Sequence, residues 1–246
     1  MREDTNTPAI EEAVWSIVVN DESWSSGTAS PGSERALGVG RLVMDGLIED
    51  MADLSSIRDR TLENGAIRVD ANIAHHRLAA GRALRQHQAA AGCGLLHFIT
   101  CAPQLLSRSR AGDVPEPAEI ATMLDSLFES CRRAAPGGGV HAAGLWSAGE
   151  LRFITVDVAR HAAIEKVVGT ACLTSGLPVH GGLVSTARLS GAMTLLAARA
   201  GVGWMASRSI PTTLAVDIAA ASGLTLVARA TSGAARFIVP PTTVPE

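Results

Sequence analysis

Apolar and polar positions alternate in short runs through the first third of the 246-residue chain. After a polar lead, the apolar run at 13–20 is typical of a strand, and the stretch behind it, rich in Ser, Gly and Pro, is expected to form turns as far as Ser33. Apolar residues spaced three and four apart predict a helix over 33–48 that Ser33 would cap. Strands are predicted at 54–60 and 65–73, because the Asn-Gly pair between them is typical of a hairpin turn.

The remainder of the chain alternates helix-like and strand-like patterns. A basic stretch at 75–87 is predicted to form a helical connector, and an apolar stripe over 116–133 predicts an amphipathic helix. The segment 145–155 fits a hairpin around Ala148-Gly149, and Asp157 would cap the helix that follows it. The tail is predicted to contain strands at 179–186, 202–207, 224–230 and 236–239 and helices at 190–200 and 212–222. This order is typical of a sheet covered by helices.

Composition excludes several function classes. The chain has 47% hydrophobic residues, enough for a sizeable core, but only 3% aromatic residues and no tyrosine. A stacking surface for single-stranded nucleic acid is therefore not expected, and a formal net charge of -3 with scattered basic residues argues against nucleic-acid binding in general. No apolar run approaches the roughly 20 residues that span a bilayer. The polar N-terminus and four cysteines without disulfide spacing favour a reducing cytoplasm.

A glycine-flanked cysteine is the first candidate for chemistry. Cys93 lies between two glycines, just ahead of a short apolar run that ends at Cys101. Flanking glycines allow a tight turn and leave the sulfur uncrowded, as a reactive thiol requires. An inert buried cysteine is the alternative, since free cysteine is among the most buried residue types. Cys131 falls on the apolar stripe of the helix over 116–133 and is interpreted as part of the core.

Two further segments carry histidines next to groups that could bind an anion. The glycines at 137–139 lead to His141 and would let backbone amides approach a phosphate. Asp157, His161 and Glu165 recur at a spacing of four, so they would share one helix face directly after a strand. A solvated helix face with ordinary ion pairs is the alternative.

The loop at 207–213 lies between a predicted strand and a predicted helix cap. Its hydroxyl groups, together with Arg208 and the free amides of the helix, could hold a phosphate. A plain helix-capping loop explains the same residues equally well.

Seven short segments, taken in order, resemble the formate dehydrogenase accessory sulfurtransferases, the FdhD family. Together they span nearly the whole chain, and their shared order argues against chance, although no single segment is diagnostic. The segments are 13–20, 37–48, 92–94, 138–143, 157–161 with Lys166, 188–190 and 207–212.

The resemblance implies an α/β fold with a mixed sheet, helices on both faces and a cytidine-deaminase-like core, plus a smaller N-terminal β/α lobe. Residues 1–90 would form this lobe and its connector, and residues 91–246 the core, both integrated in one fold. A cytoplasmic homodimer is implied as well.

The resemblance also implies a function. Members of this family take persulfide sulfur from a cysteine desulfurase and pass it to the molybdenum of a molybdopterin guanine dinucleotide cofactor for formate dehydrogenase. Neither a nucleic acid, a membrane nor a metal held by the protein is expected. The implied catalytic residues are Cys93, His141, Asp157 and His161, and the implied cofactor-binding residues are Gly138, Gly139, Arg160, Lys166, Arg188, Ser207, Pro211 and Thr212.

The chain departs from the family pattern at several positions. Leu96 replaces the second cysteine of the family's Cys-x-x-Cys loop, Val156 and Ala192 replace two carboxylates, and Ala162 replaces an amide. Ala159 stands where the family has a glycine. Three functions therefore stay open: a sulfurtransferase with one cysteine, a repurposed enzyme acting on another small molecule or nucleotide with His141, Asp157 and His161 as acid and base, and a non-catalytic binder. Deaminase-type zinc chemistry is excluded, because Ala143 stands where its glutamate is needed and no Cys-x-x-Cys follows.

Overall fold

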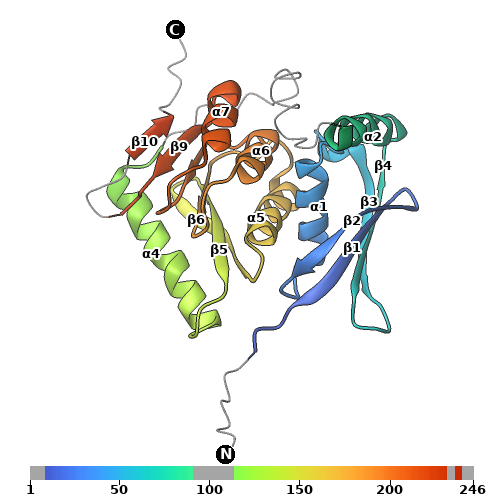
Figure 1. Ribbon diagram of the computed structural model, residues 1–246, viewed down its shortest axis with the longest axis horizontal. Coiled ribbons are helices and arrows are strands. Elements are labelled where there is room, and N and C mark those ends of the chain that lie inside the picture. Colours follow the sequence, from blue (N-terminus) through green and yellow to red (C-terminus); the bar gives the residue numbers. More distant parts are fainter. Residues whose placement is uncertain (1–8, 91–113, 232–235, 240–246) are drawn as a thin grey trace, which may run out of the picture.

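The computed structural model describes residues 9–90, 114–231 and 236–239. It contains two sheets with helices between them and a further helix on the outer face of the larger sheet (Figure 1). Sheet A has the strand order β2-β1-β4-β3, and sheet B has the order β10-β9-β8-β7-β5-β6. The predicted α/β class, with mixed sheets and helices on both faces, is confirmed. The division of the chain at residue 90 stays a prediction.

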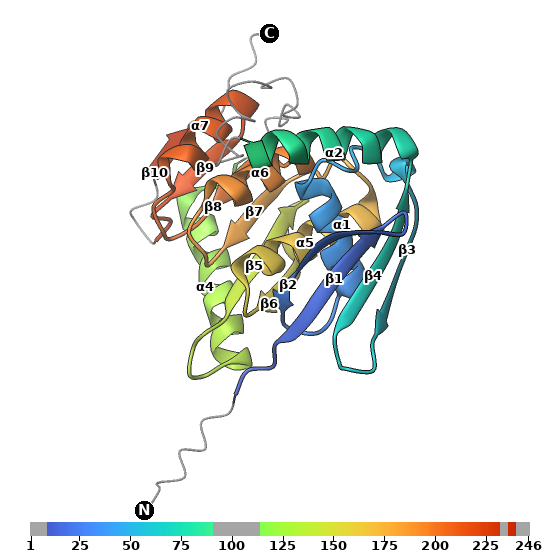
Figure 2. The same ribbon diagram turned by 45° about the vertical axis from the view of Figure 1, so that its right-hand side comes forward.

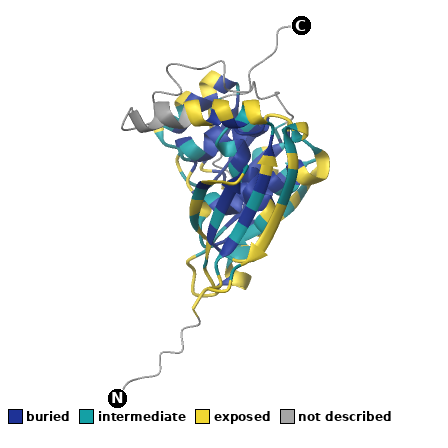
Figure 3. Ribbon diagram, turned by 90° about the vertical axis from the view of Figure 1, so that its right-hand side faces the viewer, coloured by how far each residue is buried: buried dark blue, intermediate teal, exposed yellow. Residues whose placement is uncertain are grey.

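Sheet A covers one side of the molecule and leaves its outer face open (Figure 3). Alternate residues of its strands, such as Trp15, Ile17 and Val69, are buried against α1 (Glu34–Met44). The helix α2 (His75–Ala90) lies across one end of the molecule (Figure 2). The strands are β1 (Ala13–Val19), β2 (Glu22–Ala29), β3 (Leu54–Thr61) and β4 (Ile67–Ile73), and a short 3₁₀ helix, η1 (Met51–Asp53), precedes β3.

The prediction of turns between the first strand and Ser33 is wrong, because most of that stretch is the strand β2. It pairs antiparallel with β1 and buries Trp24 and Ala29, while Ser23, Ser26 and Thr28 are exposed. Small polar residues are acceptable in a strand whose second face meets solvent. Ser33 does stand at the N-cap position of α1, but it adopts a left-handed conformation and its side chain makes no cap hydrogen bond.

Sheet B forms the larger half of the core. Its strands β7, β8 and β9 are parallel and are connected through α6 and α7, whereas β5, β6 and β10 pair antiparallel. One face packs on α4 and the other on α5. The strands are β5 (His141–Ser147), β6 (Glu150–Asp157), β7 (Gly182–Ser185), β8 (Trp204–Ala206), β9 (Thr225–Ala228) and β10 (Arg236–Val239), and the helices are α4 (Pro117–Ala134), α5 (Arg160–Ser175), α6 (Gly191–Ala200) and α7 (Thr213–Ser222).

The two halves meet where α1 crosses α5 at close range. A Cβ atom added at Gly40 would lie 2.0 Å from the carbonyl oxygen of Glu165, and one added at Gly169 would lie 1.8 Å from the carbonyl oxygen of Ala36. Only glycine permits such an approach of one helix backbone to another. Gly40 of α1 and Gly169 of α5 therefore serve the packing between the two halves.

The helix α5 begins later than predicted. Asp157 ends β6 and is fully buried, Ala159 occupies the N-cap position, and the first helical residue is Arg160. The prediction of Asp157 as the helix cap is therefore wrong, because Ala159 takes the N-cap position and the Asp157 carboxylate accepts hydrogen bonds from Lys166 and from the N–H groups of Ser30 and Ala159. The other predicted hairpins, helices and tail strands are confirmed, and Thr212 caps α7.

In the part of the chain that the structure describes, no helix combines the length and the apolar character needed to cross a membrane.

Candidate functional site

Several of the predicted site residues that the structure describes lie at one edge of sheet B. The parallel strands β7 and β8 end at this edge, and because β5 is antiparallel to β7, its first residue, His141, lies there too. β6 returns to the same edge, so that Asp157 is the register partner of His141. Ligands of α/β proteins bind at the carboxyl ends of parallel strands. The first turn of α5, with Arg160 and His161, starts directly behind this edge.

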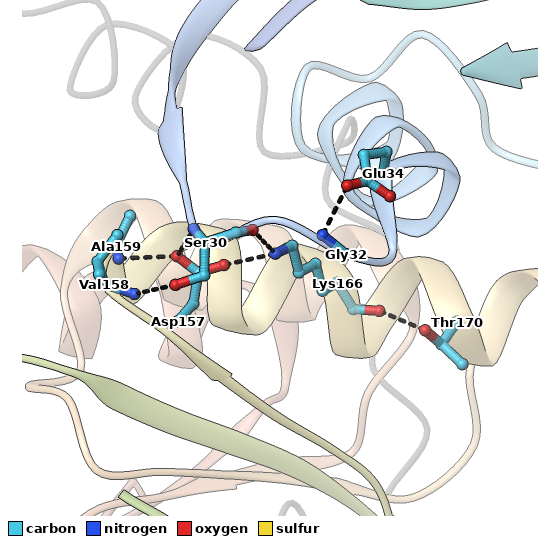
Figure 4. Close-up of polar contacts among 8 residues, drawn as sticks. All are labelled: Ser30, Gly32, Glu34, Asp157, Val158, Ala159, Lys166 and Thr170. Carbon is cyan, nitrogen blue, oxygen red and sulfur yellow. Dashed lines mark hydrogen bonds and ion pairs between the residues drawn. The ribbon is translucent and has the colours of Figure 1, made fainter. Parts of the chain in front are cut away.

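Asp157 and Lys166 form a fully buried ion pair, in which Lys166 Nζ lies 2.6 Å from Asp157 Oδ2 (Figure 4). Their side chains are 0% and 2% exposed. Lys166 also donates to the carbonyl oxygen of Ser30 at 2.6 Å, while Asp157 Oδ1 accepts hydrogen bonds from the backbone N–H groups of Ser30 (3.1 Å) and Ala159 (2.9 Å). Neither charge faces the solvent. If Asp157 takes part in catalysis and Lys166 in cofactor binding, as predicted, both side chains would therefore have to do so from within the core.

The two histidines of the edge are biased toward the neutral imidazole. Burial, followed by the charge of Arg160, lowers the pKa of His141 below its ordinary value of 6.5, and the carboxylate of Asp157 opposes this only in part. Burial and the charges of Arg160 and Arg41 lower the pKa of His161 in the same way. At neutral pH both side chains can accept a proton, and Arg160 remains a cation beside them.

A second buried carboxyl group, that of Glu165, lies on α5 one turn after His161. Glu165 is almost completely buried, and its nearest cation is Arg41 of α1, with 3.5 Å between Nη1 and Oε1. Arg41 is shared with Asp45, whose Oδ2 also accepts a hydrogen bond from Trp24 Nε1 at 2.7 Å. Burial is the main reason that the pKa of Glu165 rises from 4.5 to about 7. The alternative of a solvated helix face is therefore wrong, because the middle of α5 is enclosed.

The glycine run contributes Gly138 to the lining of a small cavity of about 320 Å³. Gly138 and Gly139 have φ values of 85° and 87°, which favour glycine, and Gly138 borders the cavity together with His141 and Thr186. Cys131 also lines it, half-buried rather than in the predicted core position, and burial raises the pKa of its thiol. A raised pKa makes this thiol a weak nucleophile.

The loops after β7 and β8 complete this edge. Arg188 is exposed, whereas Ser207 is fully buried and donates to the carbonyl oxygen of Ala187 at 2.7 Å. Thr212 accepts a hydrogen bond from the backbone N–H of Ala215 at 3.2 Å and so caps α7. Pro211, beside it, is partly buried. The hydroxyl groups of Ser207 and Thr212 thus already have partners within the fold, as the capping-loop alternative requires.

Arg208 connects this loop to the cavity. Its guanidinium lies 4.6 Å from the ring centre of Phe128, which lines the cavity, and pairs with Asp125 of α4. Sequence reasoning named Arg208 as a phosphate ligand, and the structure places it in a stacked contact at the cavity rim. Ser30, Arg41 and Thr186 were missed. Their contacts join elements far apart in the sequence, and no local pattern indicates them.

Cys93, Leu96 and Cys101 lie outside the described residues, so the reactive-thiol prediction is not placed by the structure. Within the described ranges, no group of three or more His, Cys, Asp or Glu side chains could hold a metal ion.

Known proteins resemble this chain over most of its length. The model of the FdhD/NarQ family matches residues 10–239. The chain is 32% identical to the sulfur carrier protein FdhD of Streptomyces avermitilis, covering 89% of this chain and 82% of that protein, and 32% identical to the protein of that name from Xanthomonas axonopodis pv. citri, covering 81% and 72%. The crystal structure of a putative formate dehydrogenase accessory protein from Desulfotalea psychrophila superimposes with a TM-score of 0.70 at 25% identity, covering 96% of this chain and 90% of that one. The chain therefore belongs to the FdhD/NarQ family.

Proposed function

We propose that this protein is a sulfur carrier for formate dehydrogenase. It would take persulfide sulfur from a cysteine desulfurase and deliver it to the molybdenum of a molybdopterin guanine dinucleotide cofactor, which is its substrate rather than a resident group. Family membership supports the sulfur-transfer role, since the relatives above carry the name sulfur carrier protein. The observation that carries the proposal is the convergence of Gly138, His141, Arg160 and His161 at one edge of sheet B.

The chemistry proposed for this edge is a transfer of sulfur between thiols. The thiolate of Cys93 attacks the outer sulfur of the donor's persulfide, a new S–S bond forms, and the donor leaves as a thiolate. No net oxidation or reduction occurs in this step. A neutral His141 or His161 is suited to take the proton of the attacking thiol, and in both the lowered pKa keeps the imidazole unprotonated at neutral pH.

Charge and backbone geometry suit the nucleotide part of the acceptor. Arg160 stands in the first turn of α5, whose N-cap residue Ala159 offers no side-chain acceptor to the helix amides. Free amides at a helix N-terminus and a nearby guanidinium both favour phosphate oxygens. Gly138 and Gly139, with their left-handed backbone, allow close approach of a ligand beside His141. We propose the cytoplasm and a homodimer as the setting, as the resemblance implies.

The acid–base alternative with His141, Asp157 and His161 is less well supported. A general base must reach its substrate, whereas Asp157 is 0% exposed and held by Lys166 and Ser30.

Persulfide loading tests the proposal directly. After incubation with a cysteine desulfurase and cysteine, the protein should gain the mass of one sulfur atom, and cyanide should remove it. Cys93→Ser should abolish the gain. The matched control is Cys172→Ala, because Cys172 is a core residue whose pKa burial raises to about 12, and this variant should load normally. A wild-type protein that gains no sulfur, or a Cys93→Ser variant that loads fully, contradicts the proposal.

A further inference from the structure

Ser30 is the residue through which sheet A reaches the first turn of α5. It follows the last residue of β2 and precedes α1, and all three of its polar groups are used by the β6–α5 junction (Figure 4). Its N–H donates to Asp157 Oδ1 (3.1 Å), its Oγ accepts from the N–H of Val158 (3.1 Å), and its carbonyl oxygen accepts from Lys166 Nζ (2.6 Å). These bonds span more than 120 residues of sequence, because the partners of Ser30 lie 127, 128 and 136 positions away.

The bonds close into a compact network, here called the Ser30 clamp: Ser30, Asp157, Val158, Ala159 and Lys166. Both carboxylate oxygens of Asp157 are occupied, Oδ1 by the N–H groups of Ser30 and Ala159 and Oδ2 by Lys166. A buried ion pair gains little stability over an apolar pair, since desolvation offsets the attraction. Such a pair does, however, specify one arrangement of the groups around it when every partner is satisfied.

The Ser30 clamp lies at the start of α5, where no side chain of the N-cap residue fixes the first turn. Ala159 at the N-cap of α5 has no oxygen to accept from the helix amides, so the helix start lacks the usual side-chain cap. Instead, the Asp157 carboxylate holds the N–H of Ala159 and the Ser30 hydroxyl holds the N–H of Val158. The next two residues are Arg160 and His161. The direction in which these two side chains leave the helix is therefore set by the clamp.

We propose that Ser30 is a positioning residue: its hydroxyl group holds the N–H of Val158 and its backbone holds Asp157 and Lys166, and together these contacts orient Arg160 and His161 at the edge of sheet B. The inference rests on the proposed function for its effect on sulfur transfer, but the orientation itself is independent of that function. On this view Asp157 and Lys166 hold the first turn of α5 in place and touch neither the sulfur donor nor the acceptor. A small displacement of catalytic groups can cost about 100-fold in rate.

The test compares Ser30→Ala with wild type and with Ser30→Thr. The alanine variant removes only the acceptor for the Val158 N–H and keeps both backbone contacts of Ser30, so it is expected to fold. Histidine side-chain NMR across a pH series reports on His161. In Ser30→Ala its pKa should move toward the ordinary value of 6.5, because a loosened first turn admits water around the imidazole. In Ser30→Thr, which keeps the hydroxyl, the wild-type titration should return.

The control for simple destabilisation is Ser222→Ala. Ser222 is a buried serine of α7 whose hydroxyl donates to the carbonyl oxygen of Ile218 at 2.8 Å, away from α5. It should lower the melting temperature without moving the His161 titration. The second readout is the rate at which sulfur-loaded protein activates formate dehydrogenase, expected to fall roughly 10- to 100-fold in Ser30→Ala.

The outcomes separate the two proposals. An unchanged His161 titration in Ser30→Ala, or an equal shift in Ser222→Ala, overturns the positioning role. A shifted titration in a protein that carries no sulfur would keep the positioning role and refute the sulfur-carrier function. A shifted titration with an unchanged transfer rate would show that the orientation of His161 does not matter to transfer, and it would overturn the role of Ser30 in sulfur transfer.

Discussion

Gly169→Ala should separate the two helices at the centre of the molecule. The added Cβ would lie 1.8 Å from the carbonyl oxygen of Ala36, 2.6 Å from its carbon and 2.9 Å from the backbone nitrogen of Gly40, whereas ordinary contact begins at 3.4 Å. All three atoms are backbone, so no side chain can rotate away. The axes of α1 and α5 would have to move apart by about 1.5 Å, and the core packed around them would loosen.

The size of the effect follows from two opposing terms. Alanine is the better helix former by about 1 kcal/mol, which favours the variant. Overpacking costs about 1–3 kcal/mol in a core that can adjust and more where a backbone must shift, as it must at this crossing. We expect a net loss of about 3 kcal/mol in the free energy of unfolding. For a chain of this size this corresponds to a fall of roughly 6–12 °C in melting temperature.

Urea unfolding followed by circular dichroism measures this loss. The matched control is Gly137→Ala, since nothing lies within 4 Å of a Cβ at Gly137 and its backbone needs no left-handed conformation. The control should stay within about 0.5 kcal/mol of wild type. If Gly169→Ala is as stable as this control, or more stable, the helices do not approach as closely as described and the reasoning is refuted.

Two further predictions concern the buried charges of α5. Burial raises the pKa of Glu165 from 4.5 to about 7. The contribution of the protonated carboxyl group to stability is therefore fully present below pH 4.5 and is lost as the pH rises through 7. Glu165→Gln should therefore flatten the fall in unfolding free energy between pH 5 and 8, which amounts to roughly 3 kcal/mol, and a pH profile parallel to that of wild type would contradict the shift. Lys166→Met leaves the Asp157 carboxylate buried without its cation and should cost about 3–5 kcal/mol in urea unfolding. The double variant Lys166→Met with Asp157→Asn should recover part of this lost stability. If it recovers none, the buried ion pair is contradicted.

The sequence predicted most elements because local signals decided them. The Asn64-Gly65 turn joins β3 and β4 as expected, and Gly201 and Gly223 end α6 and α7 in the left-handed conformation that glycine favours. In each case a residue type and its immediate neighbours determine the backbone. The strand β2 was missed because its serines and glycine are typical of turns, and only its pairing with β1 makes it a strand.

The sequence indicated which residues lie together at this edge, but it did not indicate which groups they contact. His141, Arg160 and His161 were named from their glycine and helix context, and the antiparallel return of β5 and β6 does bring them to one edge. The spacing of Asp157, His161 and Glu165 suggested a single helix face. That inference assumed a helix starting at Asp157, whereas the carboxylate is held in the preceding strand by a backbone amide of Ser30. Ser30 lies 127 residues from Asp157, so the local spacing of residues around Asp157 could not indicate this contact.

The burial of Glu165 and Lys166 did leave a signal in the sequence. They are flanked along α5 by Ala162, Ala163 and Gly169, small residues that allow neighbouring elements to approach on several sides. A helix without a polar stripe is typically enclosed, and charged residues within it need partners from other elements. Glu165 and Lys166 are adjacent, so their side chains leave the helix in different directions. One meets Arg41 of α1 and the other meets Ser30 and Asp157, and together they tie both sheets to a single helix.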